Sequence, residues 1–290
     1  MTMSPPLLSR DVFIKLHTAL EAKIRKLTLT PSGRYKLCET GIDNLMREGA
    51  KSLKATNTAA RMNFAENSHD LLDDQLRKHP RTKLSFVTLA PRECCVPIDG
   101  DHDRAIDDLQ ILLYEQFGGF SFYGFIEPSL FANFPITPNN KKTIAWHVHM
   151  LVWEDDANTL NEVAEIIDVF NRNNEALIPS KAAGHFRSVS RQQALNRIWY
   201  MSKAPLRDMH AFPSKRTGSY KTKKRTLRPG QAVLLHNIMS HITIPDLCVS
   251  NFSGDEIAEG AKSATIAMVE QREQERLNKN YRLNKGRQHA

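Results

Sequence analysis

Residues 146–153 read WHVHMLVW, an apolar run in which two histidines stand one residue apart. Such β-prone residues predict a strand, and alternate side chains of a strand point to the same face. His147 and His149 therefore share one face, and the apolar residues on either side of them take the other. Two neutral imidazoles about 7 Å apart on a strand can chelate one metal ion if a neighbouring strand supplies a third ligand. The run predicts metal-assisted chemistry on one face of a sheet.

The composition is that of a folded protein with an anionic partner. The chain has 290 residues, of which 41% are hydrophobic and 25% charged, enough for one large domain or two small ones. The net charge of +8 favours an anionic partner, of which nucleic acid is the commonest. A merely basic soluble protein is the alternative.

The cysteines and the apolar runs predict a cytoplasmic protein. The four cysteines form no C-x-x-C pair, which indicates reduced thiols. We expect no signal peptide, because the first residues lack a basic segment followed by an apolar core. No uncharged apolar run approaches the roughly 18 residues needed to cross a membrane, so no membrane partner is expected.

The elements around the histidine strand predict an α+β fold. Apolar residues recur at helical spacing through residues 9–80, where Ser9 or Asp11 can cap the first helix. Downstream, strands and helices alternate, with expected strands at 84–89, 120–127, 144–153 and 184–189 and expected helices at 101–117, 155–170 and 190–202. We expect a central antiparallel sheet that carries the histidine pair, with flanking helices and with helical extensions at both ends of the chain.

The region after residue 205 has a different composition, rich in basic residues. No acid occurs from Met209 to Pro245, and the cations there predict an exposed basic loop. This loop is either a solvated mobile surface or a set of phosphate contacts. The candidate DNA-binding residues are Lys215, Arg216, Lys221, Lys223, Lys224 and Arg225.

The chain then divides into four parts. They are an N-terminal helical region (1–80), a sheet domain (81–205), a basic loop with a connecting segment (206–252) and a charged C-terminal helix (253–290). The last helix is a solvent-exposed tail, a dimer contact or a DNA-binding element.

Two further segments complete a candidate site. Tyr200 and Lys203 stand three residues apart at the end of an expected helix, so phenol and ammonium project from one face. A nearby cation or metal would favour the phenolate, the nucleophilic form. Glu127 ends the strand that precedes the histidine strand, and consecutive strands usually pair. It is either the third metal ligand or a surface carboxylate at a strand end, with His185 as a rival contact.

Two imidazoles and one carboxylate leave open positions on a metal, which suits Mg²⁺ or Mn²⁺ in phosphoryl transfer. Attack by Tyr200 on phosphorus would give a covalent phosphotyrosine and a free hydroxyl. Tyrosine suits a bond that is later transferred. The alternatives without a catalytic role are that the histidines are simply polar residues on a half-exposed strand and that Tyr200 is a core aromatic residue beside Trp199.

This combination resembles the HUH endonuclease superfamily, and more narrowly the rolling-circle replication initiators of bacterial plasmids. Residues 86–89, read FVTL, match the family's first motif; His147-Val148-His149 matches the second, and Tyr200 to Lys203, read YMSK, matches Tyr-x-x-Lys. The resemblance covers about residues 81–205. It implies a site-specific nick at a replication origin, with His147 and His149 on the metal and Tyr200 as nucleophile. Lys203 would position the phosphate or the metal.

The chain departs from some members of that superfamily. Asn196 and Ala204 occupy the places where a second tyrosine would lie one helical turn away, which implies a single-tyrosine mechanism. Closing the cycle then needs a second subunit in a homodimer, a recruited water or another tyrosine such as Tyr220. The phosphate loop of a built-in helicase is missing, so a host helicase would unwind the DNA and a host polymerase would extend the 3′ end.

Other functions fit parts of the pattern. A conjugative relaxase or a single-strand transposase uses the same chemistry. Relaxases usually carry three histidines and an N-terminal tyrosine, and the small transposases are usually shorter. A non-catalytic DNA-binding regulator is the alternative from another class, against which the complete set of histidines, tyrosine and lysine argues.

Overall fold

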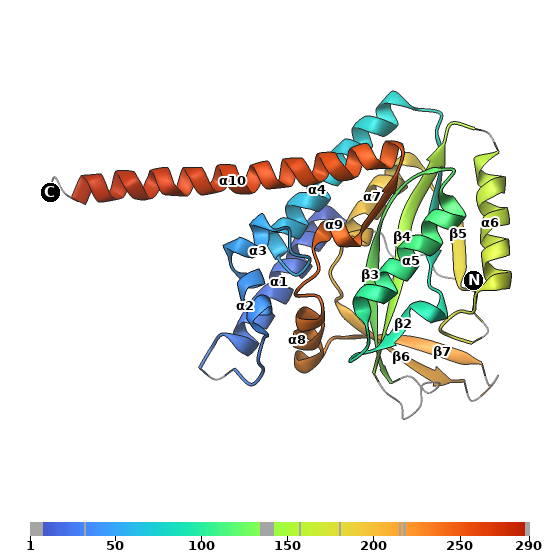
Figure 1. Ribbon diagram of the computed structural model, residues 1–290, viewed down its shortest axis with the longest axis horizontal. Coiled ribbons are helices and arrows are strands. Elements are labelled where there is room, and N and C mark those ends of the chain that lie inside the picture. Colours follow the sequence, from blue (N-terminus) through green and yellow to red (C-terminus); the bar gives the residue numbers. More distant parts are fainter. Residues whose placement is uncertain are drawn as a thin grey trace.

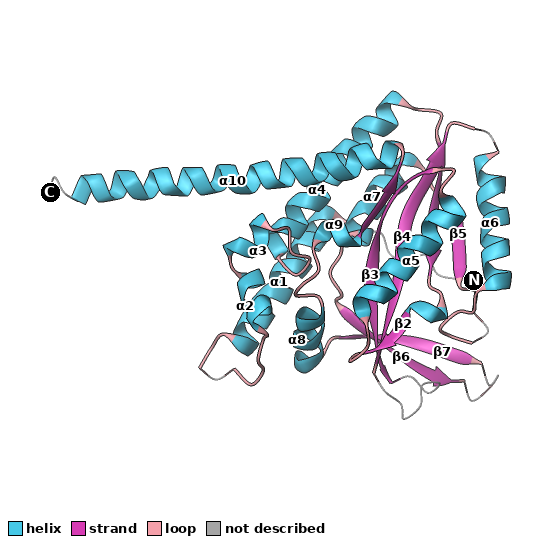
Figure 2. Cartoon of the chain, in the orientation of Figure 1, coloured by secondary structure: helices cyan, strands magenta, loops and turns pink. Residues whose placement is uncertain are grey.

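The computed structural model describes residues 8–31, 33–133, 142–156, 158–179, 181–214, 216 and 219–287. It confirms the predicted α+β class, since one curved sheet is packed between helices (Figures 1 and 2). None of the helices in these ranges has both the length and the apolar character needed to span a bilayer.

The sheet is built around β4 (Thr143–Glu154), the expected histidine strand. Its order is β5-β1-β4-β3-β6-β7, with β2 added beside β4 and β8 beside β3. The pairs are antiparallel except for β3 with β6, which run parallel. The other bounds are β1 Lys83–Leu89, β2 Cys95–Pro97, β3 Ser121–Asn133, β5 Gly184–Ser188, β6 Arg207–Pro213, β7 Tyr220–Thr226 and β8 Cys248–Asn251.

Helices cover both faces of β4, which explains why its residues are almost all buried. On the face of Trp146 lie α5 (His102–Phe117) and α6 (Thr159–Asn173), and the Trp146 indole donates a 3.2 Å hydrogen bond to His102. On the histidine face lie α4 (Thr58–Lys78) and α7 (Arg191–Met201). The short 3₁₀ helix η1 (Arg92–Cys94) precedes β2. The histidines thus sit beneath helices rather than on an open sheet.

The N-terminal helices pack against the histidine side of the sheet through α4 and α7. Phe13 on α1 lies 5.5 Å from Trp199 on α7, measured between ring centroids. The remaining helices are α1 (Arg10–Thr28), α2 (Glu39–Leu45), α3 (Arg47–Lys51), α8 (Pro229–Ile238), α9 (Ile244–Leu247) and α10 (Ser253–Arg287). The first part of α10 runs beside α4, where Asn67 donates a hydrogen bond to Thr265, and the rest extends away from the body (Figure 1).

Two expectations were wrong, one about the end of a strand and one about the structure of the basic segment. Strand β3 does not stop at Pro128 but continues to Asn133. Its second edge pairs with β8 at residues 122–125 and with β6 from Leu130 onward, so Pro128 falls in an unpaired gap where a missing N–H costs no ladder bond. The expected basic loop is instead a β-hairpin, because β6 pairs with β3 and thereby offers β7 a partner.

Candidate metal centre and adjacent tyrosine

Strand pairing brings the three expected ligands together. Glu127 on β3 stands directly opposite His147 on β4. His147 Nε2 lies 3.0 Å from Glu127 Oε1, and His149 Nε2 lies 3.3 Å from the same oxygen. All three residues are buried, and one ligand atom of each lies within 4.8 Å of the others. This group could hold a metal ion.

The outer nitrogens of both imidazoles have partners of their own. His149 Nδ1 lies 2.7 Å from the Thr88 hydroxyl, and His147 Nδ1 lies 3.3 Å from the carbonyl of Ala145. A carbonyl only accepts, so this contact favours a proton on His147 Nδ1. Nε2, the nitrogen that faces Glu127, is then the one available to a metal ion. The donor set therefore fits a divalent metal ion.

The ionisation of these groups follows from burial and pairing. Burial lowers the pKa of His149 to about 3, against the opposing charge of Glu127, so the ring is neutral and able to bind metal. Burial alone would raise the pKa of Glu127, but the Lys203 charge and the two histidines outweigh it and hold that pKa well below its usual range. The site therefore presents an anionic carboxylate at neutral pH.

Lys203 is the cation that pairs with this carboxylate in the described structure. Its Nζ lies 2.6 Å from Glu127 Oε1 and also contacts Oε2. The same nitrogen donates a 3.1 Å hydrogen bond to the carbonyl of Tyr200. Burial lowers the pKa of Lys203, and Glu127 opposes that shift. The lysine thus links the candidate ligands to the helix of the tyrosine.

The structure places Tyr200 beside the same group. Its ring centroid lies 5.0 Å from that of His149, and Lys203 Nζ lies 3.8 Å from the centre of the Tyr200 ring. The expected preference for the phenolate is not found, because burial and the Glu127 charge raise the pKa of Tyr200. The ammonium faces the ring rather than the hydroxyl, so the phenol keeps its proton at rest.

One arginine that the sequence did not single out also faces this site. Arg187 on β5 stands opposite Phe86 in the strand register, and its charge opposes the rise in the pKa of Tyr200. Nε and Nη2 of Arg187 are shielded from solvent and lack a hydrogen-bond partner among the described residues. Such donors suit an incoming phosphate. In the sequence, Arg187 is marked only by its place in the short expected strand at 184–189, two residues after His185 and therefore on the same face.

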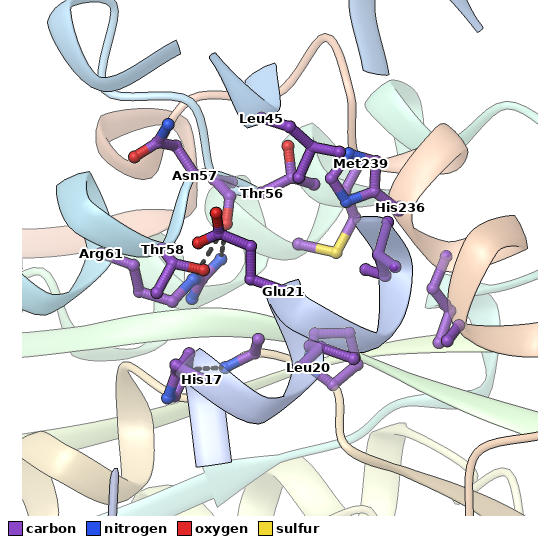
Figure 3. Close-up of a pocket in the computed structure, with 16 residues that line it drawn as sticks. His17, Leu20, Glu21, Leu45, Thr56, Asn57, Thr58, Arg61, His236 and Met239 are labelled. Carbon is purple, nitrogen blue, oxygen red and sulfur yellow. Dashed lines mark hydrogen bonds between the residues drawn. The ribbon is translucent and has the colours of Figure 1, made fainter. Parts of the chain in front are cut away.

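Two side chains of the N-terminal helices form hydrogen bonds with the backbone of the residues immediately before and after Lys203. Arg61 Nη1 donates a 2.8 Å hydrogen bond to the carbonyl of Ser202, and His17 Nε2 accepts one of 2.8 Å from the Ala204 N–H. Both side chains are buried and line a cavity of about 40 Å³ between α1, α4 and α8 (Figure 3). That volume admits a few water molecules. The N-terminal region thus supports the segment that carries Lys203.

The expected DNA-binding cations do not form one surface. Lys224 on β7 pairs with Met209 on β6, and Met209 pairs with Phe131 on β3. Phe131 lies on the same face of β3 as Glu127, so Lys224 also points to that face. The others on β7, namely Lys221, Lys223 and Arg225, point to the opposite face. Arg216 is exposed between the two strands, and Lys215 lies outside the described residues. His185 is exposed on β5 and is not part of the metal-binding group found among the described residues.

Comparison of the chain with protein-family models, with curated proteins and with solved structures gives no match in any of the three.

Proposed function

We propose that the chain is a metal-dependent tyrosine DNA endonuclease and strand transferase of the HUH type, which nicks a replication origin and initiates rolling-circle replication of a plasmid. The observation that carries the proposal is the contact of Tyr200 with His149 inside a buried Glu-His-His group. A nucleophilic hydroxyl beside a candidate metal site is the arrangement that transesterification of a phosphodiester needs.

In this proposal Glu127, His147 and His149 hold a divalent metal, Mg²⁺ or Mn²⁺. When bound, it would polarise the scissile phosphodiester and stabilise the charge that develops on it. Thr88 holds the His149 ring in the orientation that presents Nε2.

Tyr200 performs the bond exchange. Its Oη forms a bond to phosphorus while the bond from phosphorus to the 3′ oxygen breaks, and the phenol proton ends on that oxygen. The products are a 5′-phosphotyrosine and a free 3′ hydroxyl, which primes synthesis by a host polymerase. Lys203 lies against the Tyr200 ring, where its charge favours the phenolate character that develops during attack. Arg187 supplies donors for the phosphate oxygens, since its Nε and Nη2 have no partner within the part of the chain that the structure describes.

The proposed partners follow from this chemistry. The substrate is single-stranded or locally melted origin DNA, with a host helicase to unwind the duplex. A single tyrosine performs one transfer per active site, so a second copy of the chain is one route to completing the cycle.

The test is formation of a covalent adduct. The full chain is mixed with a labelled single-stranded origin oligonucleotide and Mn²⁺, and the products are separated under denaturing conditions. We expect an adduct that Tyr200→Phe abolishes while oligonucleotide binding persists. Tyr114→Phe is the matched control, because Tyr114 bonds the Ser250 carbonyl on the other side of the sheet and should leave the yield unchanged.

The outcomes of this test are distinct. An undiminished adduct in the Tyr200→Phe chain removes the assignment of the nucleophile. Oligonucleotide binding without an adduct under any divalent metal favours the non-catalytic DNA-binding regulator instead.

A further inference from the structure

A second concave surface lies at the far end of the sheet from the candidate metal centre. It has a volume of about 370 Å³ and is formed by the end of β3, the β6–β7 hairpin, the first turn of α8 and Tyr35. Its charged lining residues are all basic, namely Lys142, Arg225 and Arg228, with His210 beside them. This combination selects an anion.

This pocket opens on the sheet face opposite the metal centre. Arg225 pairs with Asp208 across the hairpin, whereas Met209, the next residue, shares the face of Phe131 and Glu127. The cations of the pocket therefore do not contribute to the site of Tyr200. Whatever binds here is separate from the scissile phosphate.

The donors of the pocket are held in place before any ligand arrives. Asp208 is fully buried and accepts hydrogen bonds from Nε and Nη2 of Arg225, at 3.3 and 3.1 Å. Gln231 donates a third, of 2.9 Å, to the same carboxylate. Nη1 of Arg225 takes no part in this pair, so among the described residues its two N–H groups remain for a ligand.

Three residues that line the pocket carry further donors without a partner among the described residues. In the first turn of α8, Gln231 and Ala232 bond to the Arg228 carbonyl, while Gly230 keeps a free N–H at the positive end of the helix. His210 accepts from Asn133 at Nε2, so its Nδ1 carries the proton, and that buried nitrogen has no acceptor. The exposed Arg228 side chain adds a guanidinium at the rim.

We propose that this pocket is a second phosphate-binding site, which takes the phosphate group of a nucleotide or of a polynucleotide strand. The residues that line the cavity supply a fixed guanidinium, a helix N-terminus and an imidazole, and each of these can donate to a phosphate oxygen. The Tyr35 ring packs on Gly230, where an added Cβ would lie 3.0 Å from Tyr35 Cε1, and it walls one side. The assignment does not depend on the nicking reaction.

The test is a titration read at the site itself. The full chain without divalent metal is titrated with inorganic phosphate, with a 5′-mononucleotide and with an unphosphorylated oligonucleotide. The probe is the ¹H–¹³C imidazole signal of His210, assigned with His210→Gln. We expect a saturable shift with phosphate, weakened about tenfold or more by Arg228→Gln, the effect of losing one charged hydrogen bond.

Lys221→Gln is the matched control, because Lys221 is an exposed cation on the same face but outside the pocket lining. The tighter of the two nucleotide probes identifies the source of the phosphate. A His210 signal that stays still with all three probes, or that moves equally in the Arg228→Gln chain, overturns the proposal. Because no metal and no cleavage are involved, this result is independent of the adduct assay.

Discussion

Lys203 Nζ lies 2.6 Å from Glu127 Oε1, so the lysine after the tyrosine helix and the buried carboxylate of the third strand form a partly buried ion pair. The same carboxylate oxygen faces both histidines. The charge of the candidate metal centre is therefore balanced by a side chain when no other cation is present. This relationship makes the lysine and a bound metal alternative partners of one carboxylate.

Replacing Lys203 by Met should destabilise the metal-free chain and increase its response to metal. Glu127 would remain ionised and buried without its cation, which costs about 3 kcal/mol of unfolding free energy. A divalent ion restores the missing charge, so Mn²⁺ should raise the melting temperature more in this variant than in the wild type. Urea and thermal unfolding with and without Mn²⁺ measure both effects. Lys262→Met, at an exposed pair with Glu259, serves as control. Equal Mn²⁺ shifts in variant and wild type contradict the prediction.

Replacing Thr88 by Val should weaken metal binding, because the hydroxyl holds Nδ1 of His149 at 2.7 Å and thereby aims Nε2 at Glu127. Loss of such an orienting partner typically reduces metal affinity about 10- to 100-fold. Calorimetric titration with Mn²⁺ gives the affinity. Thr88→Ser keeps the hydroxyl and should retain most of it. An affinity unchanged by Thr88→Val would show that the ring is oriented by packing alone, for which the stacked Phe86 is the candidate.

Replacing Arg61 by Met should lower both stability and the rate of adduct formation. The guanidinium bonds the carbonyls of Ala55 and Ser202, which would both lose a buried donor. Burial lowers the pKa of Arg61 to about 10, so it remains a cation at neutral pH. The expected loss of unfolding free energy is about 3 kcal/mol, measured by urea unfolding.

The adduct assay separates the two roles of Arg61. If Arg61 positions Lys203, the rate at saturating oligonucleotide falls at a temperature where the variant is fully folded. A rate that matches the wild type there would leave Arg61 a purely structural role. Arg172→Met, at an exposed position of α6, controls for loss of positive charge.

His17 should make stability depend on pH in a defined window. Burial lowers its pKa to about 4 in the folded chain, from 6.5 when unfolded. Between these values the unfolded chain binds more protons, so stability is full above pH 6.5 and falls as the pH drops toward 4. The total loss is about 3 kcal/mol over that range. Urea unfolding of the wild type and of His17→Gln, compared between pH 5 and 7, isolates this contribution. A difference between the two curves that is constant with pH would refute it.

The sequence alone determined the α+β class and the identity of the central strand. The run at 146–153 is strongly β-prone and apolar, and it forms most of strand β4, which extends from Thr143 to Glu154. The alternation within it assigned both histidines to one face, and chain order suggested that Glu127 would pair nearby. These are properties of local periodicity and of adjacent strands, which a sequence displays directly.

The basic hairpin shows where that information ends. Residues 220–226 are polar and charged throughout, so nothing in their pattern marks a strand. They form β7 because β6, itself attached to the edge of β3, supplies backbone partners. The pairing then sends alternate cations to opposite faces, and this divides what looked like one basic surface into two.

Only the tertiary structure decided which side chains surround the candidate site. The Ser202 carbonyl accepts a hydrogen bond from Arg61, 141 positions earlier in the chain, and the Ala204 N–H donates one to His17, 187 positions earlier. Neither Arg61 nor His17 stands out within its own helix. Burial, which raises the pKa of Tyr200 instead of lowering it, likewise depends on packing between α7 and the sheet. Local periodicity fixes which face a residue takes on its own element, whereas its partners and its ionisation depend on elements brought together by folding.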